Sequence, residues 1–138
     1  MIPKFRVALK NKIFSEVWSI DFVDETVTTP IYNKLDGEYL GEGVYELNQV
    51  ILMQSTGLFD TNGVEIFEGD VVTSTWFKDY DDLVGYRKLG KVVYKNGYFC
   101  IEYPEDTEKD YPNTILDFAI NVEIIGNIYE NKEPGYDS

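Results

Sequence analysis

Hydrophobic and polar positions alternate along most of the chain, a pattern typical of half-buried β-strands and not of helices. In the stretch Phe14–Phe22, the side chains of Trp18, Ile20 and Phe22 fall on one face, with polar residues between them. We therefore expect one half-buried strand there. Further strands are expected at Phe5–Leu9, Glu25–Thr29, Val50–Gln54, Val64–Phe67, Val71–Phe77, Lys91–Tyr94, Tyr98–Tyr103 and Val122–Tyr129.

Turn-forming residues separate these strands. Asn62-Gly63 and Asn96-Gly97 supply the positive φ angles of tight turns, and Asn96-Gly97 is the clearest hairpin signal in the chain. In Glu68-Gly69-Asp70, Gly69 allows a bend, and the Asp70 carboxylate is able to accept backbone N–H bonds. Asn127 is expected to bond a neighbouring loop.

Other stretches predict connections. Pro30 is expected to end the strand before it, and the glycine-rich stretch Asn33–Gly43 to be a mobile connection. Residues 78–90 are expected to form a polar loop with a few aromatic interruptions. Asn113–Phe118 predicts one short helical turn, and Gly126 a bulge in the last strand.

Short strands and glycine-rich turns together predict a mainly β fold made of one or more small barrels, with short helical turns at most. The order of elements in the C-terminal half is that expected of an SH3-like barrel. We expect an N-terminal β region at 1–48, the SH3-like region at 49–131 and a flexible tail at 132–138. It is open whether the two regions are separate domains or one compact unit.

Charge is the strongest feature of the composition. The chain has 138 residues and a formal net charge of −13, and residues 13–77 carry 12 acidic side chains against Lys34 alone. This charge opposes binding to nucleic acids and to anionic membranes. One cysteine excludes an internal disulfide, and no segment approaches the apolar length of a membrane span or a signal peptide. A cytoplasmic protein is expected.

Catalytic and metal-binding residues are scarce. There is no histidine, which excludes histidine-dependent nucleophilic catalysis and histidine-rich zinc sites. Cys100 lies mid-strand and is expected to pack as a small hydrophobic residue. Asp60, Asn62 and Glu65 only partly match a calcium loop, and a plain turn is the better interpretation. We expect no cofactor, no metal site and no enzymatic activity.

Acidic side chains also cluster in the loop 78–90. Asp79, Asp81 and Asp82 would need further ligands from elsewhere to hold a metal, so a solvated loop is expected.

Aromatic and basic residues gather around the same loop. They form the predicted interaction surface, which comprises Trp76, Phe77, Tyr80, Tyr86 and Arg87. Small barrels often bind single-stranded nucleic acid through such residues, but the overall charge argues against that role here. Exposed aromatic side chains also make good anchors for protein interfaces.

Three blocks of sequence resemble the YopX family of bacteriophage and prophage proteins. They are Leu52–Leu58 running into Asp60–Val72, the hairpin Gly90–Phe99, and Val122–Asn131. The start of the chain, Lys4–Val7, also resembles the opening motif of the family. That motif usually continues with a tryptophan, where this chain has Ala8. The resemblance implies a mainly β fold, a phage or prophage origin and oligomerisation, but no established activity.

These observations favour a non-enzymatic phage or prophage accessory protein that binds a host or phage protein. Two alternatives stay open. The acidic charge of residues 13–77 is compatible with a DNA mimic that inhibits a host nucleic-acid enzyme. Exposed strand edges are compatible with a self-assembling structural component, and a homo-oligomer is expected.

Overall fold

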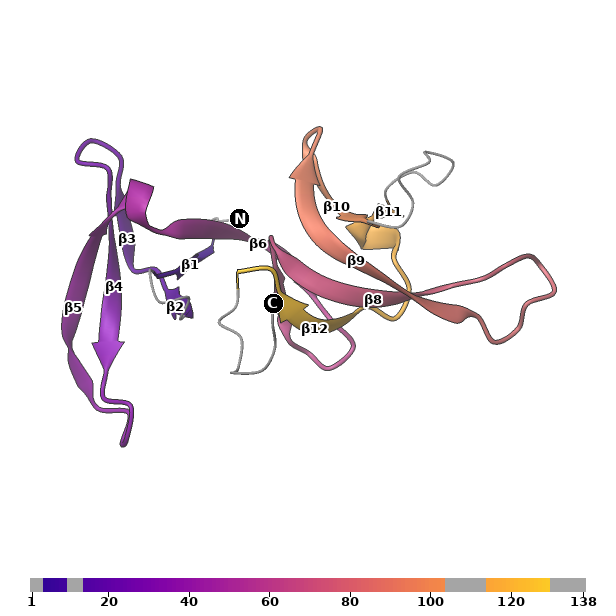
Figure 1. Ribbon diagram of the computed structural model, residues 1–138, viewed down its shortest axis with the longest axis horizontal. Coiled ribbons are helices and arrows are strands. Elements are labelled where there is room, and N and C mark those ends of the chain that lie inside the picture. The colour runs from indigo at the N-terminus through magenta and orange to yellow at the C-terminus, as the bar shows by residue number, and fades with distance from the viewer. Residues whose placement is uncertain (1–3, 10–13, 104–113, 130–138) are drawn as a thin grey trace. The chain divides into compact units, whose positions relative to one another are not determined.

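The computed structural model describes residues 4–9, 14–103 and 114–129, and these residues contain no α-helix (Figure 1). Their strands are β1 (Phe5–Ala8), β2 (Phe14–Glu16), β3 (Ser19–Asp21), β4 (Thr26–Tyr32), β5 (Tyr39–Glu46), β6 (Ile51–Phe59), β7 (Glu65–Phe67), β8 (Asp70–Trp76), β9 (Tyr86–Lys95), β10 (Tyr98–Glu102), β11 (Thr114–Ile115) and β12 (Glu123–Asn127). Two short 3₁₀ turns, η1 (Leu47–Gln49) and η2 (Leu116–Phe118), complete the elements. The fold is mainly β, as predicted.

The chain divides into two compact units. Unit 1 comprises residues 1–54 and 129–138, and unit 2 comprises residues 55–128. The division falls within β6. Its first residues pair with β1 in unit 1, and its last residues pair with β7 in unit 2.

Two sets of antiparallel strands make up unit 1. β1 lies between β2 and the first part of β6, with Val7 opposite Leu52. β4 lies between β3 and β5 in a second sheet. Val7 and Met53 are buried, as is Val27 on β4. The predicted strand Val50–Gln54 forms within β6, where Met53 is buried and Ile51 is 41% exposed.

The prediction of one strand at Phe14–Phe22 is wrong. The segment forms two strands, β2 and β3, and Phe22 lies beyond both of them, 75% exposed. β3 ends because the Asp21 carboxylate accepts hydrogen bonds from the backbone N–H groups of Val23 and Asp24. Such a side-chain turn competes with strand pairing.

The predicted connection at Asn33–Gly43 is also wrong. β4 continues through Pro30 to Tyr32, and β5 begins at Tyr39, so the connection is only a tight turn. β3 pairs only with Thr26–Thr28, so that at Pro30 β4 has a single neighbour in the sheet. A proline is tolerated there as it is on an edge strand.

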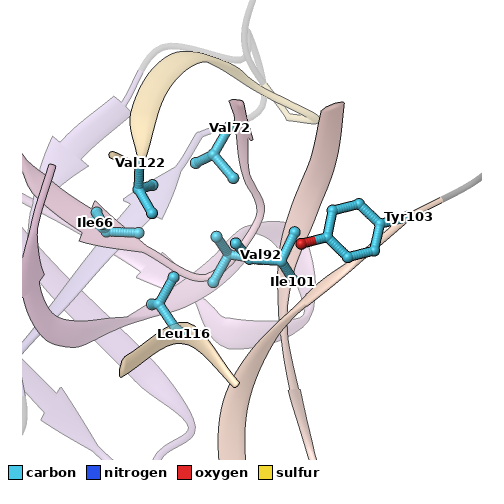
Figure 2. Packing of buried hydrophobic residues seen from close by; sticks show 7 residues of the cluster. All are labelled: Ile66, Val72, Val92, Ile101, Tyr103, Leu116 and Val122. Carbon is cyan, nitrogen blue, oxygen red and sulfur yellow. The ribbon is translucent and has the colours of Figure 1, made fainter. Parts of the chain in front are cut away.

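Unit 2 is built on a curled, half-barrel sheet with the strand order β11-β10-β9-β8-β12 (Figure 1). All of its pairings are antiparallel. Figure 2 shows the side chains that gather against it, which are Ile66, Val72, Val92, Ile101, Tyr103, Leu116 and Val122. They come from β7 to β10, from the residue after β10, from η2 and from the segment before β12, so burial joins elements far apart in sequence. The finer SH3-like arrangement stays a prediction.

Local predictions in unit 2 are largely confirmed. Asn96 and Gly97 have φ angles of 55° and 92° in the turn of the β9–β10 hairpin. The register of β12 against β8 shifts between Ile124 and Gly126, which places a bulge where the glycine predicts one. Cys100 is 1% exposed and packs as a small hydrophobic residue. The helical turn predicted within Asn113–Phe118 is η2.

The predicted loop at 78–90 is wrong in its second half, because β9 begins at Tyr86. Gly90 is buried within β9, where a Cβ atom would lie 2.5 Å from Cγ2 of Ile101. A glycine allows this close approach of two strands, which explains why it occurs inside a strand. The predicted tail 132–138 lies outside the described residues.

Candidate functional site

β8 and β9 form a long antiparallel ribbon. Its pairing extends from Val71 opposite Lys91 to Trp76 opposite Tyr86. At the right of Figure 1, the two strands run past the other strands of the sheet and are joined by a loop. This loop, residues 77–85, carries Phe77 and Tyr80 of the predicted interaction surface.

Carboxylates order the loop. Oδ2 of Asp82 accepts a hydrogen bond from the Lys78 backbone N–H at 2.9 Å, and Oδ1 accepts from Val84 and Gly85 at 3.2 and 2.9 Å. Asp79 accepts from the backbone N–H of Asp81. The backbone N–H groups of Lys78 and Gly85 lower the pKa of the Asp82 carboxyl, against a smaller opposing effect of burial. These aspartates therefore hold the loop in shape.

Apolar side chains project from the ordered loop. Tyr80 is fully exposed, Leu83 and Val84 are 89% and 86% exposed, and Phe77 is 43% exposed. We call these four residues the ribbon tip. Sequence reasoning found Phe77 and Tyr80 but missed Leu83 and Val84, although two adjacent apolar residues in a polar loop were a usable signal.

Trp76, by contrast, belongs to the interior of unit 2. Its ring packs edge-on against Tyr103 with 5.3 Å between centroids, and its Nε1–H donates to the Tyr103 hydroxyl at 3.1 Å. The Lys88 ammonium lies 4.3 Å from the centre of the Trp76 ring. The partly buried indole is thus held by two neighbours, and it packs against the core cluster of Figure 2.

Arg87 ties the two strands of the ribbon together. Its guanidinium donates to the Thr75 hydroxyl at 2.7 Å and to the Thr73 hydroxyl and carbonyl oxygens at 2.6 and 2.9 Å. Tyr86, the first residue of β9, pairs with Trp76 and is 39% exposed. Of the five predicted surface residues, the structure therefore places Phe77 and Tyr80 at the tip, whereas Trp76 and Arg87 support the ribbon beneath it.

A buried polar pair secures the opposite end of the ribbon. Asp70 is 2% exposed, and its carboxylate accepts hydrogen bonds from the Phe67 backbone N–H and from the Asn127 side chain, both at 2.8 Å. Gly69, with a φ of 92°, bonds to the Val92 carbonyl and accepts from Ile128. The roles predicted for Gly69, Asp70 and Asn127 are confirmed.

Asp60 also has a structural role. Its carboxylate accepts hydrogen bonds from the backbone N–H groups of Asn62, Val64 and Ile124. Burial raises the pKa of Asp60, but these three donors together outweigh burial, so that the pKa lies below its usual value. They also occupy both carboxylate oxygens, and within the part of the chain that the structure describes no group of acidic or cysteine side chains is arranged to hold a metal ion.

A cavity of about 490 Å³ opens beside Asp60. Its lining is mixed, with apolar residues such as Leu58, Ile66 and Val122 beside polar ones such as Thr61. Asp117 is the second carboxylate of the lining and is exposed. Since Asp60 is bound by backbone N–H groups, the cavity offers no pair of free carboxylates.

Comparison with known proteins gives the family. Residues 4–133 match the family model described as YopX protein. The chain belongs to the YopX family. Its structure is similar to the crystal structure of protein EF1440 from Enterococcus faecalis, which is 27% identical over 95% of this chain and 96% of that one, with a TM-score of 0.58. No protein of curated function matches the chain.

The three blocks that carry the YopX resemblance all build the body of the units. The first block covers β7 and most of β6, the second lies in the β9–β10 hairpin, and the third contains β12. The ribbon tip falls outside them. Among the described residues, no helix is long and apolar enough to cross a membrane.

Proposed function

We propose that this YopX-family chain is a non-enzymatic phage or prophage accessory protein that binds another protein, of host or phage, in the cytoplasm of the bacterial host. The ribbon tip is the anchor of that interaction. The observation that carries the proposal is the exposure of four apolar side chains, Phe77, Tyr80, Leu83 and Val84, at the end of an ordered ribbon.

Burying these side chains in a partner would stabilise the complex, because apolar area is removed from water. The loop that presents them is already ordered by Asp79 and Asp82, and Arg87 braces the strands below. Preorganisation lowers the entropy cost of binding, and a tyrosine anchor loses little freedom of its own. The partner surface that fits the tip is an apolar pocket wide enough for a hairpin loop.

A pull-down tests the proposal. The tagged chain and a Tyr80→Ala/Leu83→Ala variant are incubated with host lysate, and bound proteins are identified by mass spectrometry after washing at low and high salt. We expect a defined partner that survives high salt and is lost with the variant, while the melting temperature of the chain is unchanged. Equal capture by both proteins would overturn the role of the tip.

One observation favours a second candidate, an acidic inhibitor that mimics DNA. Residues 14–54 carry eight acidic side chains and one lysine, and all nine are exposed. Such a surface would bind the basic cleft of a nucleic-acid enzyme, and salt would weaken the complex steeply. In the same pull-down, a nuclease or polymerase subunit that is released by salt and still captured by the tip variant would support this candidate.

A further inference from the structure

An aromatic cluster lies on unit 1, built from three separate places in the chain. The rings of Trp18 and Tyr39 are stacked, with 5.6 Å between centroids and 20° between planes. Tyr32 meets Tyr39 edge-on at 6.0 Å. Trp18 precedes β3, Tyr32 ends β4 and Tyr39 begins β5, so the β-sheet itself brings the three rings together.

The cluster is open to solvent. Trp18, Tyr32 and Tyr39 are 47%, 46% and 48% exposed. An aromatic group that served only as a core would be covered, as Tyr103 is at 4%. The half-exposed rings leave π-faces available for a ligand.

The cluster lies on an acidic stretch of the chain, and one carboxylate contacts it. The Trp18 Nε1–H donates to Glu16 at 3.3 Å, and Glu38 directly precedes Tyr39. The residues 14–54 carry a net charge of −7, and none of their carboxylates forms an ion pair with a described residue. Lys34, in the β4–β5 turn, is the one cation of this stretch and is exposed.

Exposed aromatic rings on a strongly acidic stretch of chain suit one kind of ligand. Guanidinium groups stack on aromatic rings and pair with carboxylates, whereas phosphate groups would be repelled by the surrounding charge. We propose that the Trp18–Tyr32–Tyr39 cluster binds an arginine-containing basic segment of a partner protein. This site is separate from the ribbon tip and does not depend on it.

The two tryptophans of the chain provide an internal control. Trp18 lies in the cluster, whereas the Trp76 indole N–H is bonded to Tyr103 in unit 2. A short peptide of alternating arginine and glycine is titrated into the ¹⁵N-labelled protein, and the two indole N–H resonances are followed by NMR. We expect the Trp18 resonance to shift and to saturate, while that of Trp76 stays in place.

Variants and other probes separate the cluster from simple charge attraction. Tyr39→Leu is expected to weaken peptide binding roughly threefold or more, because a cation–π partner is lost. Phe22→Leu is the matched control, since Phe22 is exposed and makes no ring contact with a described residue. A lysine–glycine peptide should bind more weakly than the arginine peptide.

Three results would overturn the proposal. The first is no Trp18 shift with the arginine peptide. The second is equal binding of arginine and lysine peptides that Tyr39→Leu leaves unchanged, which would indicate general attraction to an acidic surface. The third is a Trp18 shift caused by single-stranded oligothymidine in place of the peptide, which would make the cluster a base-stacking site.

Discussion

The two ends of the β8–β9 ribbon have opposite characters, although the same two strands form both. At the base, Asp70 and Val72 are buried, and every polar group named there is hydrogen-bonded. At the tip, Tyr80 and Leu83 are exposed. The same two strands thus belong to the stable sheet at the base and present exposed side chains at the tip. Those exposed side chains contribute little to the stability of the fold. Tyr80 and Trp76 are aromatic residues of the same stretch of sequence, and only their different exposure in the fold distinguishes them.

The largest effect is expected at the base. Asp70→Ala removes the acceptor of the Phe67 N–H and of the Asn127 amide and leaves buried donors without it. The free energy of unfolding of unit 2 should fall by roughly 2–4 kcal/mol. Denaturant titration measures this loss. Asp117→Ala, at an exposed carboxylate, is the control, and equal stability of the two variants would contradict the assigned role of Asp70.

Trp76 marks the boundary between base and tip. Trp76→Ala removes the edge-on contact with Tyr103 and the hydrogen bond to its hydroxyl. Because the indole is only partly buried, the expected loss is about 2–3 kcal/mol, below that of a fully buried aromatic residue. Thermal unfolding measures it. An unchanged melting temperature would mean that Trp76 does not stabilise the fold and belongs to the binding surface instead.

Acid should also weaken unit 2, through Asp60 in the connection between β6 and β7. The lowered pKa of Asp60 means that its carboxylate stabilises the fold above a pH of about 4, and that this contribution disappears as pH falls through the folded-state pKa. Asp60→Asn should therefore be less stable at neutral pH and lose less stability on acidification. Unfolding titrations across this range compare the two proteins. Parallel pH profiles would show that Asp60 does not carry the effect.

At the tip, the smallest effect on stability is expected. Tyr80→Ala and Leu83→Ala should each change the free energy of unfolding by no more than about 0.5 kcal/mol. Both side chains are almost wholly exposed, so their removal costs the fold little. Thermal unfolding of each single variant measures this. A large loss at either position would mean that the tip packs against the protein itself.

Much of the fold could be predicted from local sequence. Asn96-Gly97, Gly126 and Glu68-Gly69-Asp70 each dictate a backbone shape through their own chemistry, and each was placed correctly. The two strands at Phe14–Phe22 and the ladder beyond Pro30 were not predicted. Beyond Pro30, pairing with β5 decided the outcome, and alternation along one segment does not contain that information. After β3, the local turn made by the Asp21 carboxylate ended the strand.

The site was harder to predict than the fold. Trp76, Tyr80 and Arg87 stand close together in the sequence, and the pattern gives them one shared role. Their roles differ because their neighbours differ. Tyr103 contacts Trp76, and Thr73 and Thr75 accept hydrogen bonds from Arg87. Tyr80 is fully exposed and has no such neighbour among the described residues. Long-range packing, absent from the local pattern, therefore decides which aromatic residue is free to bind.

Photo-crosslinking would show directly whether the ribbon tip contacts a partner protein. A photoreactive phenylalanine analogue replaces Tyr80 in one protein and Tyr98, an exposed tyrosine at the β9–β10 turn, in another. Both are irradiated in host cells, and covalent adducts are identified by mass spectrometry. We expect one defined adduct from position 80 and none of that mass from position 98. The same adduct from both positions, or none from position 80, would contradict a binding role for the ribbon tip.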